Sequence, residues 1–196
     1  MRIHQSILIV LVIALYTNML IEFAIFFLCI ILHELGHLFF VLIFKQKINH
    51  LSINIFGGEL NCNLKGLSAL QMFLINIGGI IVNIIILFFS KFFTPYYKNI
   101  IYYYNLLLII FNALPIFPLD GYRLLEHFLN ILKNPYWQFS IISCISFFSI
   151  TCVLAYGVYM KSFGLILMGL FLLNKNIMRV RCRDKVIMKK IVGLFS

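Results

Sequence analysis

The sequence predicts an all-α integral membrane protein, a bundle of about six transmembrane helices with a short membrane-associated β-hairpin between the second and third helices. Three observations carry this prediction. Of the 196 residues, 63% are apolar and only 11% are charged, whereas soluble domains average about 45 to 50% and about 25%. The mean hydropathy of +1.03 leaves few polar side chains to face water. Long uncharged stretches alternate with short basic segments, as in a chain that crosses a bilayer repeatedly.

Stretches without charged residues place the first helices, because an unpaired charge in the hydrocarbon core is costly. The first predicted span runs from about Ile3 to Ile21. The second lies between Glu22 and Lys45, a length of roughly 34 Å at helical rise, which is enough to cross a bilayer. Residues 51–64 have alternating apolar positions around Gly57 and Gly58, and this pattern predicts the β-hairpin.

The later spans are separated by prolines and by a short turn. A third span is predicted within residues 66–90, and a fourth begins near Asn99 and is interrupted by two prolines before residue 120. The fifth starts near Trp137. Lys161 interrupts the last apolar region, and Gly157 and Ser162 nearby predict a turn there. The sixth helix is therefore short, and Lys161 must extend its ammonium group to the membrane surface.

The basic residues predict the orientation of the chain. The net charge is +10, with 16 basic and 6 acidic residues, and in a membrane protein such an excess reports topology rather than nucleic-acid binding. Six spans place both termini and 13 of the basic residues on one side, which the positive-inside rule assigns to the cytoplasm. Residues 175–196 then form a basic cytoplasmic tail that is expected to contact anionic lipid.

Three ionisable side chains stand at bilayer depth in the second predicted helix, namely His33, Glu34 and His37. Such residues are costly there unless they face a cavity or coordinate a ligand. His33 and His37 are one turn apart on one helix face, so both imidazoles can reach a single metal ion. Glu34 is then placed beside the ion as a general base, which is the HExxH arrangement of zinc hydrolases. A buried, hydrogen-bonded histidine pair explains neither the spacing nor the glutamate.

A catalytic zinc site takes three protein ligands and keeps one position open. Asp120 is the preferred third ligand, because the fourth helix breaks just before it at a depth comparable with that of His33. Two alternatives are Glu126 as the ligand and a capping role for Asp120 at the following helix. We expect one Zn²⁺ per chain.

The segment HELGH at 33–37, followed by FNALPIFPLDG at 111–121, resembles the site-2 protease family of intramembrane zinc metalloproteases. The resemblance covers a core of residues 21–132 within a single transmembrane metalloprotease domain, 1–196. It implies a zinc metalloendopeptidase in which His33, His37 and Asp120 bind zinc and Glu34 is catalytic.

The same resemblance implies substrate-binding residues. Asn112 opens the family's N-x-x-P-x-x-P segment and is expected to hold the substrate backbone or the oxyanion. The hairpin residues Phe56, Gly57 and Gly58 match the family's FGG segment, and the hairpin edge can pair with an extended substrate. Asn83 ends a stretch similar to the family's Gly-Pro-x-x-Asn. Two departures are Ile80, where the family usually has proline, and Tyr122, where a second glycine is common.

Within the family, six spans, the early HELGH and the absence of a PDZ domain look most like the stage IV sporulation protein FB subgroup, although the CBS domain of that subgroup is missing. This implies regulated intramembrane proteolysis of a membrane-associated protein, a pro-sigma factor in the mother-cell membrane of a sporulating bacterium, with membrane proteins as regulators. The alternatives are a divalent metal transporter and an inert membrane scaffold. A transporter needs a polar path that residues 23–31 do not offer, and a scaffold does not need Glu34.

Overall fold

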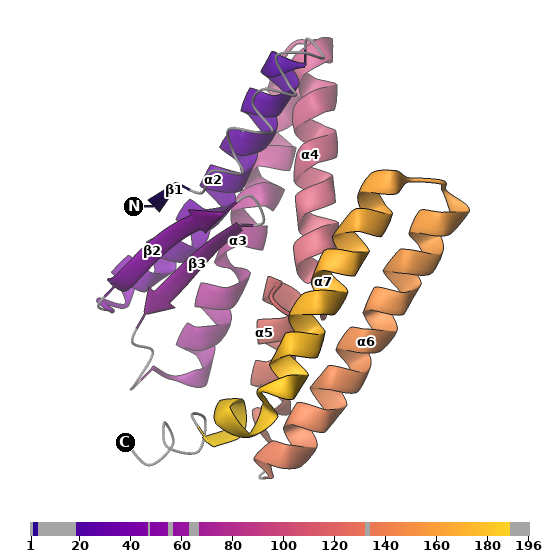
Figure 1. Cartoon of the computed structure of the whole chain (residues 1–196). Helices are drawn as coiled ribbons and strands as arrows, with labels where there is room; N and C mark the ends of the chain where they lie inside the picture. Colours follow the sequence, from indigo (N-terminus) through magenta and orange to yellow (C-terminus); the bar gives the residue numbers. More distant parts are fainter. Residues whose placement is uncertain are drawn as a thin grey trace. The chain divides into compact units, whose positions relative to one another are not determined.

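A computed structural model of the chain describes residues 2–3, 19–46, 48–54, 57–62, 67–131 and 134–188. The chain divides into two compact units, Met1–Phe111 and Asn112–Ser196 (Figure 1). Most of the described residues are helical. Residues 4–18, which make up nearly all of the first predicted span, lie outside the described part of the chain.

The first unit contains the helices α2 (Leu20–Ile43), α3 (Ala69–Phe89) and most of α4 (Pro95–Ala113), with a short 3-10 turn η1 (Ser90–Phe92) between the last two. A reciprocal pair of hydrogen bonds begins α3. The Ser68 hydroxyl accepts from the Gln71 amide at 3.3 Å, and the Gln71 side chain accepts from the Ser68 amide at 2.9 Å. Two orphan donors are thereby satisfied, so the start of α3 is well defined.

Glycines bring α2 and α3 into backbone contact. A Cβ atom built on Gly36 would lie 2.5 Å from the carbonyl oxygen of Gly78, and one built on Gly78 would lie 2.6 Å from the carbonyl oxygen of Gly36. Any side chain at either position would therefore separate the helices. This close approach places the buried face of α3 directly against the histidine-bearing face of α2.

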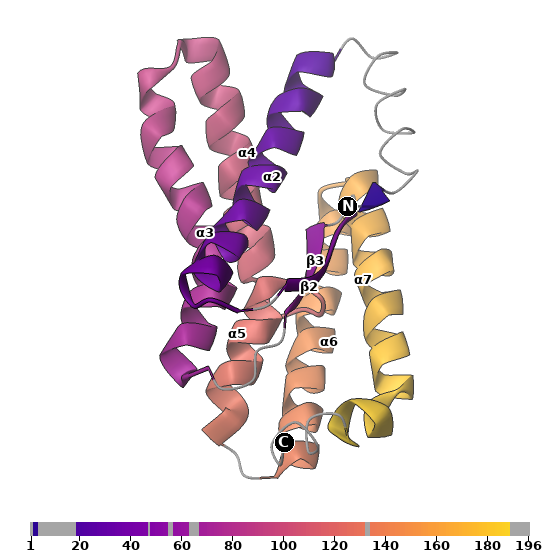
Figure 2. The same ribbon diagram turned by 90° about the vertical axis from the view of Figure 1, so that its left-hand side faces the viewer.

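A small sheet completes the first unit (Figure 2). The strand β2 (Ile48–Asn54) pairs antiparallel with β3 (Gly57–Cys62), in the segment for which the sequence predicts a hairpin. The short strand β1 (Arg2–Ile3) pairs parallel with the other side of β2, so the strand order is β1-β2-β3. The prediction that the first helix begins at Ile3 is wrong, because the backbone of Ile3 pairs with Ile53 instead.

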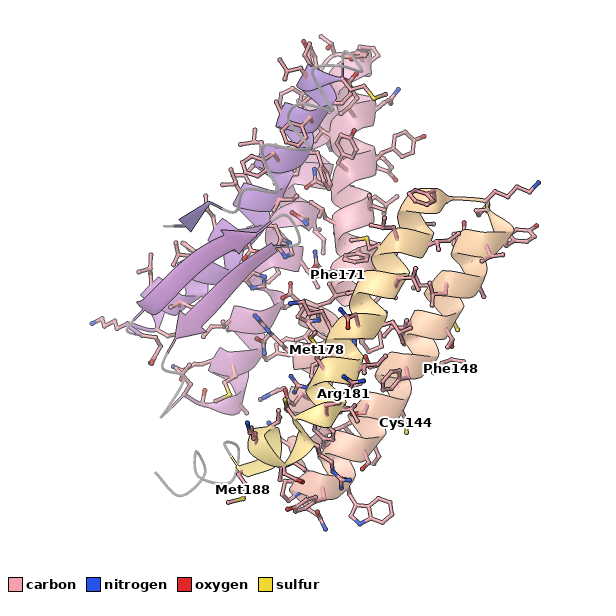
Figure 3. All side chains as sticks on the ribbon, in the orientation of Figure 1. Cys144, Phe148, Phe171, Met178, Arg181 and Met188 are labelled. Carbon is pink, nitrogen blue, oxygen red and sulfur yellow. The ribbon has the colours of Figure 1, made fainter. Side chains whose placement is uncertain are left out.

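The second unit contains α5 (Asp120–Phe128), η2 (Leu129–Ile131), α6 (Pro135–Tyr159) and α7 (Phe163–Arg181). The side chain of Asn134 caps α6 by accepting from the amides of Tyr136 and Trp137. The buried residues of α6 recur about every fourth position, as expected for one face of a helix packed on α7. Side chains on the opposite face, such as Phe148 with 70% exposure, point outward (Figure 3).

Among the described residues, four helical segments are long and apolar enough to cross a membrane, which supports a membrane protein. They are Leu20–Ile43, Ala69–Phe92, Pro135–Tyr159 and Phe163–Arg181. The predicted count of about six therefore differs from the four found in the described part of the chain. The fourth predicted helix does form, as α4, but it contains five tyrosines and three asparagines and is not one of these four segments. The turn predicted near Lys161 is present between α6 and α7, where Lys161 has φ 51°.

Candidate metal centre

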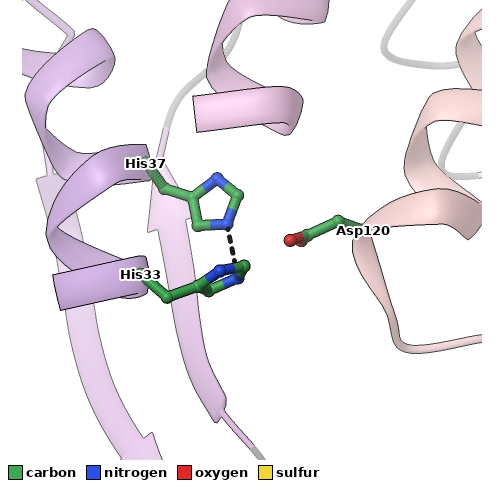
Figure 4. Close-up of side chains that lie close together, drawn as sticks. All are labelled: His33, His37 and Asp120. Atoms are coloured by element: carbon green, nitrogen blue, oxygen red, sulfur yellow. Dashed lines mark hydrogen bonds between the residues drawn. The ribbon is translucent and has the colours of Figure 1, made fainter. Parts of the chain in front are cut away.

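Two buried histidines on α2 form the core of the candidate site (Figure 4). His33 and His37 are each 4% exposed, and their Nε2 atoms lie 3.3 Å apart. Two nitrogen ligands at about 2.0–2.1 Å from a tetrahedral zinc ion are separated by about 3.3–3.4 Å. The pair is thus spaced as two ligands of one zinc ion, so the residues present fit the metal that the sequence implies.

The helix α3 fixes both imidazole rings from behind. The Nδ1 atom of His37 donates to the carbonyl oxygen of Ile75 at 2.7 Å, and the Nδ1 atom of His33 lies 3.0 Å from the side-chain amide nitrogen of Asn83. Histidines that bind metals usually bond their second ring nitrogen in this way, which orients the ring. The sequence gives no sign of the Ile75 contact, because a backbone carbonyl has no side-chain signature.

Gly79 on α3 leaves the space that the two rings occupy. A Cβ atom at this position would lie 2.5 Å from Nε2 of His37 and 2.6 Å from Nε2 of His33. Sequence reasoning missed this residue as part of the site. The signal was present, since a pair of glycines inside an apolar helix indicates close approach of another element.

Glu34 follows His33 on α2 and is half-buried, whereas the two histidines are buried. A general base must exchange protons with water and substrate, so partial exposure suits that role better than complete burial. Its carboxylate is also attached to the same rigid helix as the two histidines. Within the motif, the two histidines are therefore buried, and the acid-base residue Glu34 is more accessible.

Asp120 is the first residue of α5 and is 6% exposed (Figure 4). The N-cap position is occupied by Leu119, so the alternative that Asp120 is the N-cap residue is wrong. Polar side chains from α6 and α7 hold the backbone just before it. Asn176 donates to the carbonyl oxygen of Phe117 at 2.9 Å, and the Ser146 hydroxyl donates to Asn176 at 2.7 Å. The preceding loop is therefore anchored to two helices.

Glu126, the alternative third ligand, pairs with a cation. One of its carboxylate oxygens lies 3.8 Å from a terminal nitrogen of Arg179. The guanidinium group also stacks on two aromatic rings, at 4.4 Å from Phe117 and 4.5 Å from Tyr122. A carboxylate held by an arginine is a poorer metal ligand, because binding a metal ion there would compete with the ion pair. Asp120 is the better candidate of the two.

Of the remaining predicted site residues, Phe56, Gly57 and Gly58 belong to the first unit and Asn112 is the first residue of the second unit. Phe56 lies outside the described residues, while Gly57 and Gly58 begin β3 and pair with Asn54 and Ile53. Asn112 is half-buried in the last turn of α4. The substrate-binding role of these residues stays a prediction.

No protein-family model matches the sequence, and no curated protein matches it significantly. The chain is similar in structure to the Site-2 Protease from Methanocaldococcus jannaschii, with 24% sequence identity and a TM-score of 0.67 over 90% of this chain and 88% of that chain. The chain thus has the fold of this site-2 protease.

Proposed function

We propose that this protein is an intramembrane zinc metalloprotease of the site-2 type, which hydrolyses a peptide bond of a membrane-associated protein. The observation that carries the proposal is the His33–His37 pair, buried in an apolar helix and spaced for one zinc ion, with Glu34 beside it. The site-2 protease fold supports it independently of the residues of the motif.

We propose Asp120 as the third ligand of one Zn²⁺ per chain. We also propose that residues 1–196 form one metalloprotease domain. Three features support this choice: a carboxylate oxygen completes the ligand set of catalytic zinc sites, Asp120 is buried as the two histidines are, and each of the three residues offers one donor atom. The open fourth position of such a site is where chemistry takes place.

In the proposed reaction a zinc ion supplies Lewis acidity and lowers the pKa of water in the site. His37 would present its Nε2 lone pair, since its Nδ1 atom donates to the carbonyl oxygen of Ile75. His33 would also bind through Nε2, with its hydrogen on Nδ1. A Glu34 carboxylate oxygen accepts a proton from the water that attacks the substrate carbonyl carbon. The same oxygen then delivers that proton to the nitrogen of the leaving amine as the peptide C–N bond breaks.

An extended substrate is proposed to pair with the outer edge of β3. Within the described part of the chain, β2 is paired on both sides, by β1 and β3, whereas β3 pairs only with β2. Strand addition at such an edge unwinds a helical substrate and exposes its carbonyl groups. Asn112 is proposed to hold the substrate backbone or the oxyanion, as the family resemblance implies.

The finer proposals concern the cellular setting. We propose a bacterial cell membrane with both termini in the cytoplasm, and anionic lipid at the tail 175–196. The exposed basic side chains at Arg181, Arg183 and Lys185 support the lipid contact. A pro-sigma factor of sporulation as substrate, and regulatory or inhibitory membrane proteins as partners, rest on the family resemblance alone.

Glu34→Gln tests the proposed function. The full chain is reconstituted in liposomes with a panel of single-span model proteins, and cleavage is followed by mass spectrometry of the products. Loss of all cleavage in Glu34→Gln, with retention in the matched control Glu126→Gln, supports the proposal. Cleavage by Glu34→Gln as fast as by the wild type contradicts it. Uptake of radioactive zinc into the same liposomes would favour a transporter instead.

Zinc content tests the third ligand separately. The metal bound to purified Asp120→Ala and Glu126→Ala is measured by atomic emission after removal of loosely held ions. We expect zinc to be lost from Asp120→Ala and kept by Glu126→Ala. The opposite result would assign the ligand to Glu126.

A further inference from the structure

We infer that Asn83 is a positioning residue for the zinc ligand His33, and that its side-chain amide reverses its orientation when zinc binds. The sequence assigns Asn83 to the substrate instead. The side chain is 0% exposed and contacts Nδ1 of His33 at 3.0 Å, so it is placed behind the ring. This inference rests on the proposed zinc function.

The bond between His37 and Ile75 fixes the tautomer of His37. A carbonyl oxygen only accepts hydrogen bonds, so Nδ1 of His37 carries the hydrogen in the 2.7 Å bond to Ile75. In a neutral imidazole the other nitrogen, Nε2, then has a free electron pair. His37 is therefore held permanently in the tautomer that can bind zinc.

The contact between the two histidines fixes the tautomer of His33. Since Nε2 of His37 carries no hydrogen, the hydrogen in the 3.3 Å contact between the two Nε2 atoms belongs to His33. The Nδ1 atom of neutral His33 is then an acceptor, and the amide nitrogen of Asn83 donates to it. The three bonds form one consistent series from Asn83 through His33 and His37 to Ile75.

Zinc binding requires the opposite tautomer of His33. Its Nε2 atom must give up the hydrogen to offer an electron pair to the metal, and the neutral ring then carries its hydrogen on Nδ1. An Nδ1–H group needs an acceptor, which the amide nitrogen of Asn83 cannot be. The Asn83 oxygen Oδ1 is buried and has no hydrogen-bond partner in the described structure. A half-turn of the amide brings this oxygen to Nδ1 without any movement of the backbone.

Asn105 provides a matched control within the same unit. It is also 0% exposed with an unpartnered Oδ1 atom. Its amide nitrogen bonds the sulfur of Cys29 at 3.2 Å and the carbonyl oxygen of Ile101 at 2.8 Å, and none of its recorded hydrogen bonds involves a histidine. A substitution at Asn105 thus reproduces the loss of a buried asparagine without changing the ligand environment.

The test measures zinc affinity of the purified full chain in detergent, by competition with a chromophoric chelator, for Asn83→Leu, Asn83→Asp and Asn105→Leu. Loss of an outer partner of a metal-bound histidine typically weakens metal binding about 10- to 100-fold. We expect that loss in Asn83→Leu, near wild-type affinity in Asn83→Asp because a carboxylate oxygen accepts from Nδ1–H, and no change in Asn105→Leu. Co²⁺ affinity, followed by the visible absorption of the bound ion, should rank the variants in the same order.

Several outcomes would overturn the inference. Wild-type zinc affinity in Asn83→Leu refutes it while leaving the proposed function intact, and so does an Asn83→Asp variant as weak as Asn83→Leu. Failure of the wild-type chain to bind zinc refutes the proposed function and this inference together. If Asn83→Leu does not fold, nitrogen-15 NMR of histidine-labelled wild-type protein decides: the hydrogen of His33 must move from Nε2 to Nδ1 when zinc is added, and its retention on Nε2 refutes the inference.

Discussion

Gly79→Ala is the substitution for which the structure gives the clearest expected effect on the metal centre. The added methyl group would lie 2.5 Å from Cε1 of His33, 2.5 Å from Nε2 of His37 and 2.6 Å from Nε2 of His33. Ordinary van der Waals contact begins at about 3.4 Å. Each ring must therefore move by about 0.9 Å, or the helices must separate by a similar amount.

This displacement should affect zinc affinity strongly and folding stability only moderately. Metal–ligand distances tolerate only about 0.2 Å of change, so a shift several times larger removes at least one histidine from the ion. We expect zinc affinity to fall by about 100-fold or more, beyond the upper end of outer-partner substitutions. Overpacking costs about 1–3 kcal/mol of folding stability, and the better helix propensity of alanine offsets about 1 kcal/mol of this cost.

The assay compares zinc affinity with thermal unfolding for Gly79→Ala and for Gly164→Ala in the same detergent. Gly164 is near the start of α7 and its added methyl group would meet nothing within 4 Å, so this control should bind zinc normally and unfold at a slightly higher temperature. Undiminished zinc binding by Gly79→Ala would refute the reasoning, because it would mean that the rings do not occupy the space beside α3.

Two further predictions concern the second unit. Asn176→Leu removes the donor to Phe117 and leaves the Ser146 hydroxyl without its acceptor; we expect a loss of about 1–3 kcal/mol of stability in thermal unfolding, together with reduced zinc content, and unchanged zinc content would contradict an anchoring role for this contact. Asn134→Ala removes the N-cap of α6, which should cost about 1 kcal/mol of stability without changing zinc affinity. A loss of zinc as large as that of Asn176→Leu would contradict a purely structural role for Asn134.

The histidine ligands could be predicted from the sequence because they are ionisable residues within an apolar segment. Ionisable side chains in an apolar helix are costly, so His33, Glu34 and His37 stand out without any knowledge of the fold. The groups that hold the rings could not be predicted in the same way. The carbonyl oxygen of Ile75 belongs to the backbone and leaves no signature in the sequence. Gly79 acts through the absence of a side chain, and its only signal is the pair of adjacent glycines in an apolar helix.

The helices could be placed from the uncharged stretches, but their number could not. The pattern of charge locates α2, α3, α6 and α7 to within a few residues, because these segments are uniformly apolar. In α4 the tyrosines and asparagines make the pattern ambiguous. The pairing of Arg2 and Ile3 with β2 depends on contacts between residues about fifty positions apart, which periodicity along the chain does not report.

The helix α3 has no charged residue, yet the geometry of the histidine pair depends on it as much as on the HExxH motif. Gly78 sets the distance between the helices, Gly79 leaves room for the rings, and Ile75 and Asn83 orient them. These positions are spaced 3, 1 and 4 residues apart, so they share one face of the helix. The opposite face carries Ile84, with 51% exposure. Apolar substitutions there should leave zinc affinity unchanged, because the buried face alone determines where the two nitrogen ligands lie.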